Sequence, residues 1–292
     1  MSRANGYLIA WLVLLLAGYL AAFAMIWEFF VHTRHGQLLD MIALSGDVIG
    51  RRHVRPVVDT VLSVISVLSL VAATGVIGFI ALIRRRIALA LVTILLIAGA
   101  NLTTQLFKQV CGRPDFGADG ALTNYGNTLP SGHATVAASV AAGLVLALPP
   151  RLRGLGGLLG AGYAALTGVA TLSAGWHRPS DAVAAMVVVG GWATCAGILL
   201  VLLAGRDSVV QTRDAHPIAI SLLAAVGVAL LAAAAVGLKL TDQVVTVSPT
   251  RLSSTRLFAA YAGSAAGVAG SACLMIALLL STAHRVVARR SA

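Results

Sequence analysis

Long apolar runs separated by short polar segments dominate the chain. Eight runs contain almost no charged residues: 7–30, 59–83, 87–107, 133–149, 154–176, 181–204, 217–238 and 257–283. A helix needs about 20 apolar residues to cross the hydrocarbon core of a membrane. The pattern therefore predicts an all-α, polytopic membrane helix bundle. The first run is too long for a typical signal-peptide core, so we interpret it as a retained transmembrane helix.

Three of the runs are less apolar or shorter than the others. The run 133–149 is short, and small residues lower the hydrophobicity of 154–176 and 181–204. Such helices usually lie inside a bundle, where small faces let the backbones approach. The pairs Gly156/Gly160 and Gly263/Gly267, each four residues apart, suit contacts of this kind.

Composition agrees with a membrane protein. Of the 292 residues, 59% are hydrophobic and 11% are charged, whereas about 25% are charged in a typical soluble domain. The net charge of +11 fits basic residues that gather in cytoplasmic loops beside anionic lipid. Because the chain has no nucleic-acid motif, we expect no nucleic-acid partner. Only three cysteines are present, Cys111, Cys195 and Cys273, so we expect no disulfide framework and no metal knuckle.

Basic residues in short turns also predict the orientation in the cell membrane. The turns at 84–86 and 151–153 are short and basic, and short loops carry the orientation signal. We therefore expect both termini in the cytoplasm and the segments 31–58, 108–132, 177–180 and 239–256 outside. In the first of these, a short helix at the membrane interface is expected, with one apolar face formed by Leu38, Leu39, Ile42, Ala43 and Val48.

Three polar clusters lie at the expected outer ends of the helices. They are Lys-Gln-Val-Cys-Gly-Arg-Pro at 108–114, Pro-Ser-Gly-His at 130–133 and His-Arg-Pro-Ser-Asp at 177–181. In an apolar chain, ionisable groups at membrane depth indicate function. Taken singly, each cluster has a structural explanation, such as a helix cap, a turn or a lysine that reaches the interface. Three such clusters on one side indicate a common site.

The first two clusters suit a phosphate group. Ser131 and Gly132 directly precede an expected helix, and a helix N-terminus offers unpaired N–H groups and partial positive charge. Ser131 would cap the helix or donate its hydroxyl to the ligand, and Gly132 would let the backbone approach. Lys108 and Arg113 add cations for phosphate oxygens.

The third cluster suits nucleophilic catalysis. His177 and Asp181 are four residues apart across Pro179. A carboxylate that accepts from one imidazole nitrogen fixes the tautomer and leaves the other nitrogen available for attack. His133 would then protonate the leaving oxygen. Asp181 and the adjoining Asp115 are the only carboxylates in or directly beside the clusters, too few for a magnesium site.

The order of these motifs resembles the three-part signature of the type 2 phosphatidic acid phosphatase (PAP2) superfamily, in its bacterial membrane lipid-phosphatase branch. Lys-x-x-x-x-Arg-Pro, Pro-Ser-Gly-His and Gly-Trp-His-Arg-Pro-Ser-Asp carry the resemblance over residues 108–181. It implies a six-helix core within 1–206, followed by 207–292 with two further transmembrane helices and a basic tail. The implied activity removes phosphate from a lipid phosphomonoester or diphosphate through a phosphohistidine, with no metal or cofactor. The expected partners are the lipid phosphate and membrane lipids.

The resemblance also implies a role for each residue of the motifs. His177 would be the nucleophile, Asp181 its orienting partner and His133 the general acid. The phosphate would be held by Lys108, Arg113, Ser131 and Gly132.

The chain departs from the family pattern at two places. Four residues rather than six separate Lys108 from Arg113, and Thr171 stands where the third motif usually has an arginine. Thr171 can donate a hydrogen bond but carries no charge, and Arg178, Arg251 or Arg256 would have to replace the cation. Two alternatives stay open for this reason: a phosphotransferase on the same core, and a catalytically silent protein that binds lipid phosphate.

Overall fold

The protein is a bundle of long helices. A computed structural model describes residues 3–46, 67–83, 86–117, 126–203 and 215–287, and these residues contain no strand. This confirms the all-α, polytopic helix bundle. The α-helices are α1 (Arg3–Ile26), α2 (Arg34–Ser45), α4 (Val67–Ile83), α5 (Ile87–Val110), α6 (Gly132–Ala147), α7 (Pro150–Ser173), α8 (Pro179–Leu203), α9 (Pro217–Asp242) and α10 (Ser254–Val286). Two short turns complete the described elements, the π-helical η1 (Trp27–Val31) and the 3₁₀ turn η5 (Pro249–Arg251).

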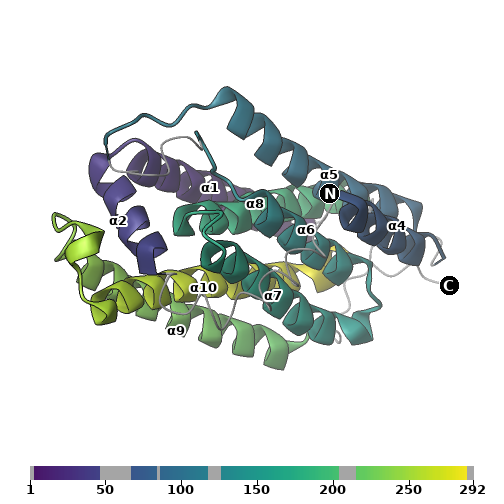
Figure 1. The fold of residues 1–292 in the computed structure, drawn as a ribbon. Coiled ribbons are helices and arrows are strands. Elements are labelled where there is room, and N and C mark those ends of the chain that lie inside the picture. Colours follow the sequence, from purple (N-terminus) through teal and green to yellow (C-terminus); the bar gives the residue numbers. More distant parts are fainter. Residues whose placement is uncertain (1–2, 47–66, 84–85, 118–125, 204–214, 288–292) are drawn as a thin grey trace.

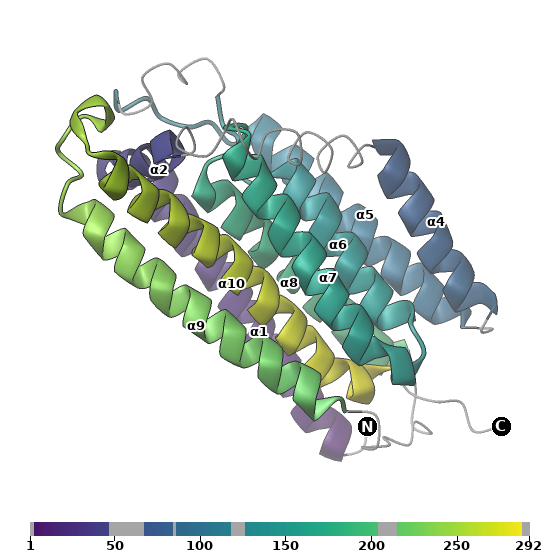
Figure 2. The ribbon, with the colours of Figure 1, turned by 60° about the horizontal axis from the view of Figure 1, so that its bottom comes forward.

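The long helices run side by side and alternate in direction along the chain (Figure 1). Figure 2 shows the start of α1 and the end of α10 at one end of the bundle, and α2 at the opposite end. Because of the alternation, the ends of α5, α7 and α9 and the starts of α6, α8 and α10 lie at the end that carries α2. All three polar clusters therefore belong to this end.

Six of the eight expected spans correspond to helices that are long and apolar enough to cross a membrane. The expected span 59–83 corresponds to α4, which is described only from Val67, so it stays a prediction. The expected span 133–149 corresponds to α6, whose 16 residues rise about 24 Å. That is short of the roughly 30 Å of a bilayer core. Most residues of α6 are buried, so it lies inside the bundle, as expected for this short run.

Small residues form close helix contacts at the expected positions. A Cβ added to Gly160 on α7 would lie 3.0 Å from the Cβ of Ala141 on α6. On α10, a Cβ at Gly263 would lie 2.8 Å from the Cα of Gly237 on α9. A larger residue at either glycine would push the helices apart, since backbone or Cβ atoms cannot move aside as a flexible side chain does. Helices α9 and α10 pack together in this way, and α10 also packs on α7 and α8.

The expected short helix after the first span is present as α2, but its apolar face packs against protein. Leu39, Ile42 and Ala43 form a buried cluster with Val245 and Ala260, the latter on α10. The helix is therefore held by the C-terminal part of the chain through this face. Val48 and Arg84–Arg85, which the expectations above included, lie outside the described residues.

Candidate active site

Four helix ends bring the three polar clusters together. His177 lies in the turn between α7 and α8, Lys108 in the last turn of α5, and Ser131 is the N-cap of α6. Asp181 lies in the first turn of α8, which begins at Pro179. Proline suits this first helical position, where no backbone N–H is needed. The chain turns sharply after α7 because Gly175 adopts a positive φ of 72°.

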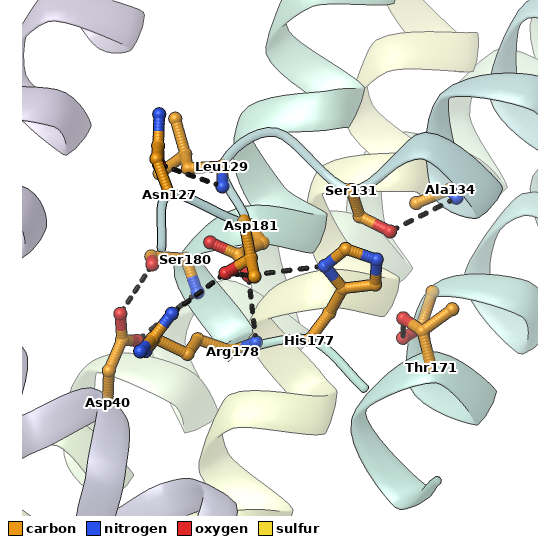
Figure 3. Close-up of polar contacts among 12 residues, drawn as sticks. Asp40, Asn127, Leu129, Ser131, Ala134, Thr171, His177, Arg178, Ser180 and Asp181 are labelled. Carbon is orange, nitrogen blue, oxygen red and sulfur yellow. Dashed lines mark hydrogen bonds and ion pairs between the residues drawn. The ribbon is translucent and has the colours of Figure 1, made fainter. Parts of the chain in front are cut away.

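His177 and Asp181 form the pair expected from their spacing (Figure 3). The Nδ1 atom of His177 lies 3.3 Å from Oδ2 of Asp181. A carboxylate at this nitrogen holds the proton on Nδ1, so the lone pair of the ring is left on Nε2. In Figure 3, Nε2 points away from Asp181, toward the space between Ser131 and Thr171. The ring is thus oriented for attack on a group bound in that space.

Asp181 is fully buried and is held by two further donors. Its Oδ2 accepts from the hydroxyl of Thr128 at 2.7 Å and from the backbone N–H of Arg178 at 3.0 Å. Its backbone carbonyl accepts from the N–H of Ser131 at 2.9 Å. The second and third clusters are therefore joined by hydrogen bonds, and the carboxylate is fixed from several directions.

The start of α6 has the features of an anion site. The hydroxyl of Ser131 accepts from the N–H of Ala134 at 3.3 Å and caps the helix. A Cβ added at Gly132 would lie 3.7 Å from Nζ of Lys108 and 3.4 Å from Nε2 of Gln105. The glycine thus keeps a small space open between the helix N-terminus and two side-chain donors. An anion placed there would meet the helix dipole and the ammonium group together.

A second imidazole lies close to the first. The ring centroids of His133 and His177 are 6.4 Å apart, and the His133 ring lies 5.4 Å from that of Trp176. Two imidazoles at this separation can act on opposite sides of one small group, one as nucleophile and one as acid.

Arg113, Arg178 and Thr171 make contacts away from Nε2 of His177. Arg113 donates to the carbonyl of Phe30 at 3.2 Å, and Arg178 donates from Nη1 to Oγ1 of Thr128 at 2.8 Å. In Figure 3 the guanidinium of Arg178 lies on the side of Asp181 opposite His177. The hydroxyl of Thr171 donates to the carbonyl of Gly168. The phosphate-binding roles of these three residues stay predictions.

The other two candidate replacement cations lie farther along the chain. Arg251 and Arg256 are exposed on η5 and on the first turn of α10, elements that pack against α2. Their roles likewise stay predictions.

Sequence reasoning missed Thr128 and Asp40. Asp40 on α2 is buried and accepts from the N–H of Ser180 at 3.2 Å and from its hydroxyl. Burial raises the pKa of the Asp40 carboxyl to about 7, while the nearby charge of Arg113 and the Ser180 hydrogen bond act in the opposite direction. The signal that could have identified Asp40 is a carboxylate within the apolar pattern of a short helix. Thr128 carried no such signal.

Among the described residues, no three His, Cys, Asp or Glu side chains are grouped closely enough to hold a metal ion. The metal-free chemistry implied by the resemblance stays a prediction, because ligand grouping does not test it.

The fold and the site define a multi-pass membrane protein whose paired histidine and carboxylate face a helix N-terminus. Residues 87–207 match the model of the PAP2 superfamily. The match covers α5 to α8 and supports a phosphatase-type function. Neither the curated proteins nor the solved structures compared with the chain gave a match. Assignment to the bacterial lipid-phosphatase branch stays a prediction.

Proposed function

We propose that the protein is a metal-independent membrane phosphatase that hydrolyses a lipid-linked phosphomonoester or diphosphate through a phosphohistidine intermediate. The observation that carries the proposal is the His177–Asp181 pair, whose free nitrogen faces the start of α6. A nucleophile, a second imidazole, an ammonium group and a helix N-terminus together supply what phosphoryl transfer requires.

The reaction has two steps. Nε2 of His177 attacks phosphorus and forms an N–P bond while the P–O bond to the lipid breaks, and His133 gives its proton to the leaving oxygen. Water then attacks the phosphohistidine, His133 takes a proton from that water, and the N–P bond breaks to release phosphate. Asp181 stabilises the imidazolium character of His177 in the first step. Lys108 and the N–H groups at the start of α6 stabilise charge on the phosphoryl oxygens.

The surroundings of the site support a lipid substrate. Val110, two residues after Lys108, is 80% exposed, and Trp176, beside His177, is 50% exposed. Tryptophan is favoured at the membrane–water boundary. A lipid could keep its chains in the bilayer there and offer its headgroup phosphate to His177. We place this boundary on the outer face of the cell membrane, with both termini in the cytoplasm, because the turns 84–86 and 151–153 are short and basic.

Thr171 keeps a second candidate function open. Its uncharged hydroxyl donates a hydrogen bond within its own helix and stands where the family pattern has a cation. Without that cation the transition state is stabilised less, which would suit a protein that binds lipid phosphate without turnover. A phosphotransferase would use the same first step and pass the phosphoryl group to a hydroxyl acceptor.

Phosphate release by the purified protein in detergent tests the proposal. Polyprenyl diphosphate, phosphatidate, phosphatidylglycerophosphate and a lipid-linked sugar phosphate are offered, each with and without EDTA. We expect release from at least one lipid, unchanged by EDTA, and a covalent phosphoenzyme in rapidly quenched samples. His177→Ala should lose the phosphoenzyme and at least about a thousandfold in kcat, whereas the exposed His32→Ala serves as the matched control.

The other outcomes separate the alternatives. Activity lost in EDTA and restored by magnesium would contradict the metal-free mechanism, and appreciable turnover by His177→Ala would contradict the nucleophile. Transfer to an added alcohol without release of phosphate would identify a phosphotransferase. Phosphate binding with neither reaction would identify a silent binding protein.

A further inference from the structure

Helix α2 touches two of the three polar clusters, although it lies outside the segment that matches the superfamily. The fully buried Gln37 donates from Nε2 to the carbonyl of Pro114 at 2.8 Å and to that of Val31 at 2.9 Å. Pro114 closes the first cluster. One turn further along the same helix, Asp40 accepts both the N–H and the hydroxyl of Ser180. Figure 3 shows Asp40 directed at Ser180, next to Asp181.

The surroundings of Asp40 are charged on one side and apolar on the other. Arg113, Arg178 and Asp181 are the charged groups whose field reaches its carboxyl. The charged side chains of Arg34 and His35 on α2, and of Lys239 and Asp242 on α9, belong to exposed residues. Asp40 therefore lies between the two arginine-bearing segments of the site.

A cavity makes the Asp40–Ser180 contact more important. Asp40 and Ser180 line a mainly apolar cavity of about 170 Å³, whose other walls come chiefly from α9 and α10 and from further residues of α2 and α8. Side chains do not fill the space at this point, so the hydrogen bonds to Ser180 are a principal link between α2 and the start of α8. Loss of this link would leave the first turn of α8, which carries Asp181, less firmly held.

The C-terminal helices in turn hold α2. Beyond the apolar cluster with Val245 and Ala260, a Cβ at Gly46 would lie 2.2 Å from the carbonyl oxygen of Leu257 on α10. His35 pairs with Asp242 at the end of α9 at 2.7 Å. The two helices outside the family segment thus reach the site through α2.

We propose that α2 is a clamp for the active site, in which Asp40 and Gln37 are positioning residues that act through Ser180 and Pro114, and that α9 and α10 serve to hold this clamp. The measurements of kcat that test this clamp rest on the proposed phosphatase function. The clamp fixes the turn that carries the His177–Asp181 pair relative to the cluster that carries Arg113. A misplacement of about 1 Å at a catalytic group can cost about a hundredfold in rate.

Variants of Asp40 and Ser180 test the clamp. We expect Asp40→Ala to lower kcat by about ten- to a hundredfold with KM within about twofold of the wild type. Asp40→Asn, which keeps an acceptor for the N–H of Ser180, should restore most of kcat. In a Ser180→Ala background, Asp40→Ala should cost less than in the wild type, because part of its effect passes through the lost hydroxyl. Arg34→Ala, on the exposed side of α2, is the matched control.

Hydrogen exchange gives a readout that does not depend on activity. In Asp40→Ala, amide exchange should speed up in peptides that cover 177–182, and in Gln37→Leu in peptides that cover 111–117, with the rest of the bundle unchanged. Local loosening together with lower kcat supports the clamp. Local loosening with wild-type kcat, or no local loosening at all, overturns it. If the wild type hydrolyses none of the lipids, the proposed function fails, and exchange alone decides whether the clamp exists.

Discussion

At the scale of single residues, Asp181 is the centre of the candidate site. One of its carboxylate oxygens, Oδ2, accepts hydrogen bonds from the imidazole of His177, the hydroxyl of Thr128 and the backbone N–H of Arg178. A carboxylate held by this many donors keeps one position, and it therefore keeps the imidazole in one orientation. Asp40 contacts Ser180, the neighbour of Asp181 in sequence, but its environment differs. Burial raises its pKa by more than the nearby positive charge and the Ser180 hydrogen bond lower it.

This difference predicts how stability depends on pH through Asp40. Its pKa is raised from the usual 3.8 to about 7, so the folded protein favours the protonated form. The contribution of Asp40 to stability is fully present below about pH 4 and is lost as pH rises through about 7. Asp40→Asn should remove this part of the dependence. The melting temperature of the wild type relative to Asp40→Asn should therefore fall between pH 4.5 and pH 8 in detergent. A constant difference over this range would contradict the raised pKa.

At the scale of elements, helix ends and glycines position the site. The start of α6 supplies the anion-binding N–H groups, and the start of α8 supplies Asp181, so the function depends on where two helices begin. The long helices behind them must stay in close contact to hold these starts in place. Gly237 and Gly263 allow the closest approach of α9 and α10 at that end of the bundle.

We expect Gly263→Ala to lower the free energy of unfolding by about 1–3 kcal/mol, the usual cost of overpacking. The added methyl would meet the Cα of Gly237 at 2.8 Å, and backbone cannot move aside without a shift of the whole helix. Gly162→Ala on α7 is the matched control, because an added Cβ there meets nothing within 4 Å. Thermal unfolding in detergent measures both. Equal stability of the two variants would show that α9 and α10 are not tightly packed at this point.

At the scale of the whole molecule, the basic residues at the end opposite the site predict which way the site faces. The end of the bundle opposite the site contains Arg153, which is only 2% exposed and donates to the carbonyls of Leu148 and Ala283. This arginine is satisfied by the ends of α6 and α10, where a cation also suits the helix dipole. It therefore has a structural reason for its place, and Arg151 and the turn 84–86 are the basic residues that predict the orientation.

Cysteine labelling tests the orientation. In a cysteine-free background, single cysteines replace Asp115 and Arg151, both exposed and at opposite ends of the bundle. We expect a membrane-impermeant thiol reagent to label position 115 in intact cells and position 151 only after the membrane is opened. Labelling of 151 but not of 115 in intact cells would reverse the orientation and place the site in the cytoplasm.

The amino-acid sequence alone predicted the helical membrane class, the contact of His177 with Asp181 and the cap formed by Ser131. The length of an apolar run predicts a membrane helix because the bilayer has a fixed thickness. The spacing of His177 and Asp181 predicts their contact because they are only four residues apart. Pro-Ser-Gly before an apolar run likewise predicted the cap by Ser131, since capping is a local interaction. These predictions need no knowledge of distant parts of the chain.

The surroundings of these residues, in contrast, depend on how distant parts of the chain pack together. The contact of Asp40 with Ser180 joins residues 140 positions apart in sequence, and no local pattern encodes such a pair. The contacts of Arg113 with Phe30 on η1 and of Arg178 with Thr128 before α6 are likewise distant in sequence. A long side chain binds whichever acceptor the packed chain brings within its reach. The interfacial helix expected from the sequence packs against α10 instead of lipid. An apolar face can be buried by either lipid or protein, so the position of α10 decides which of them covers α2.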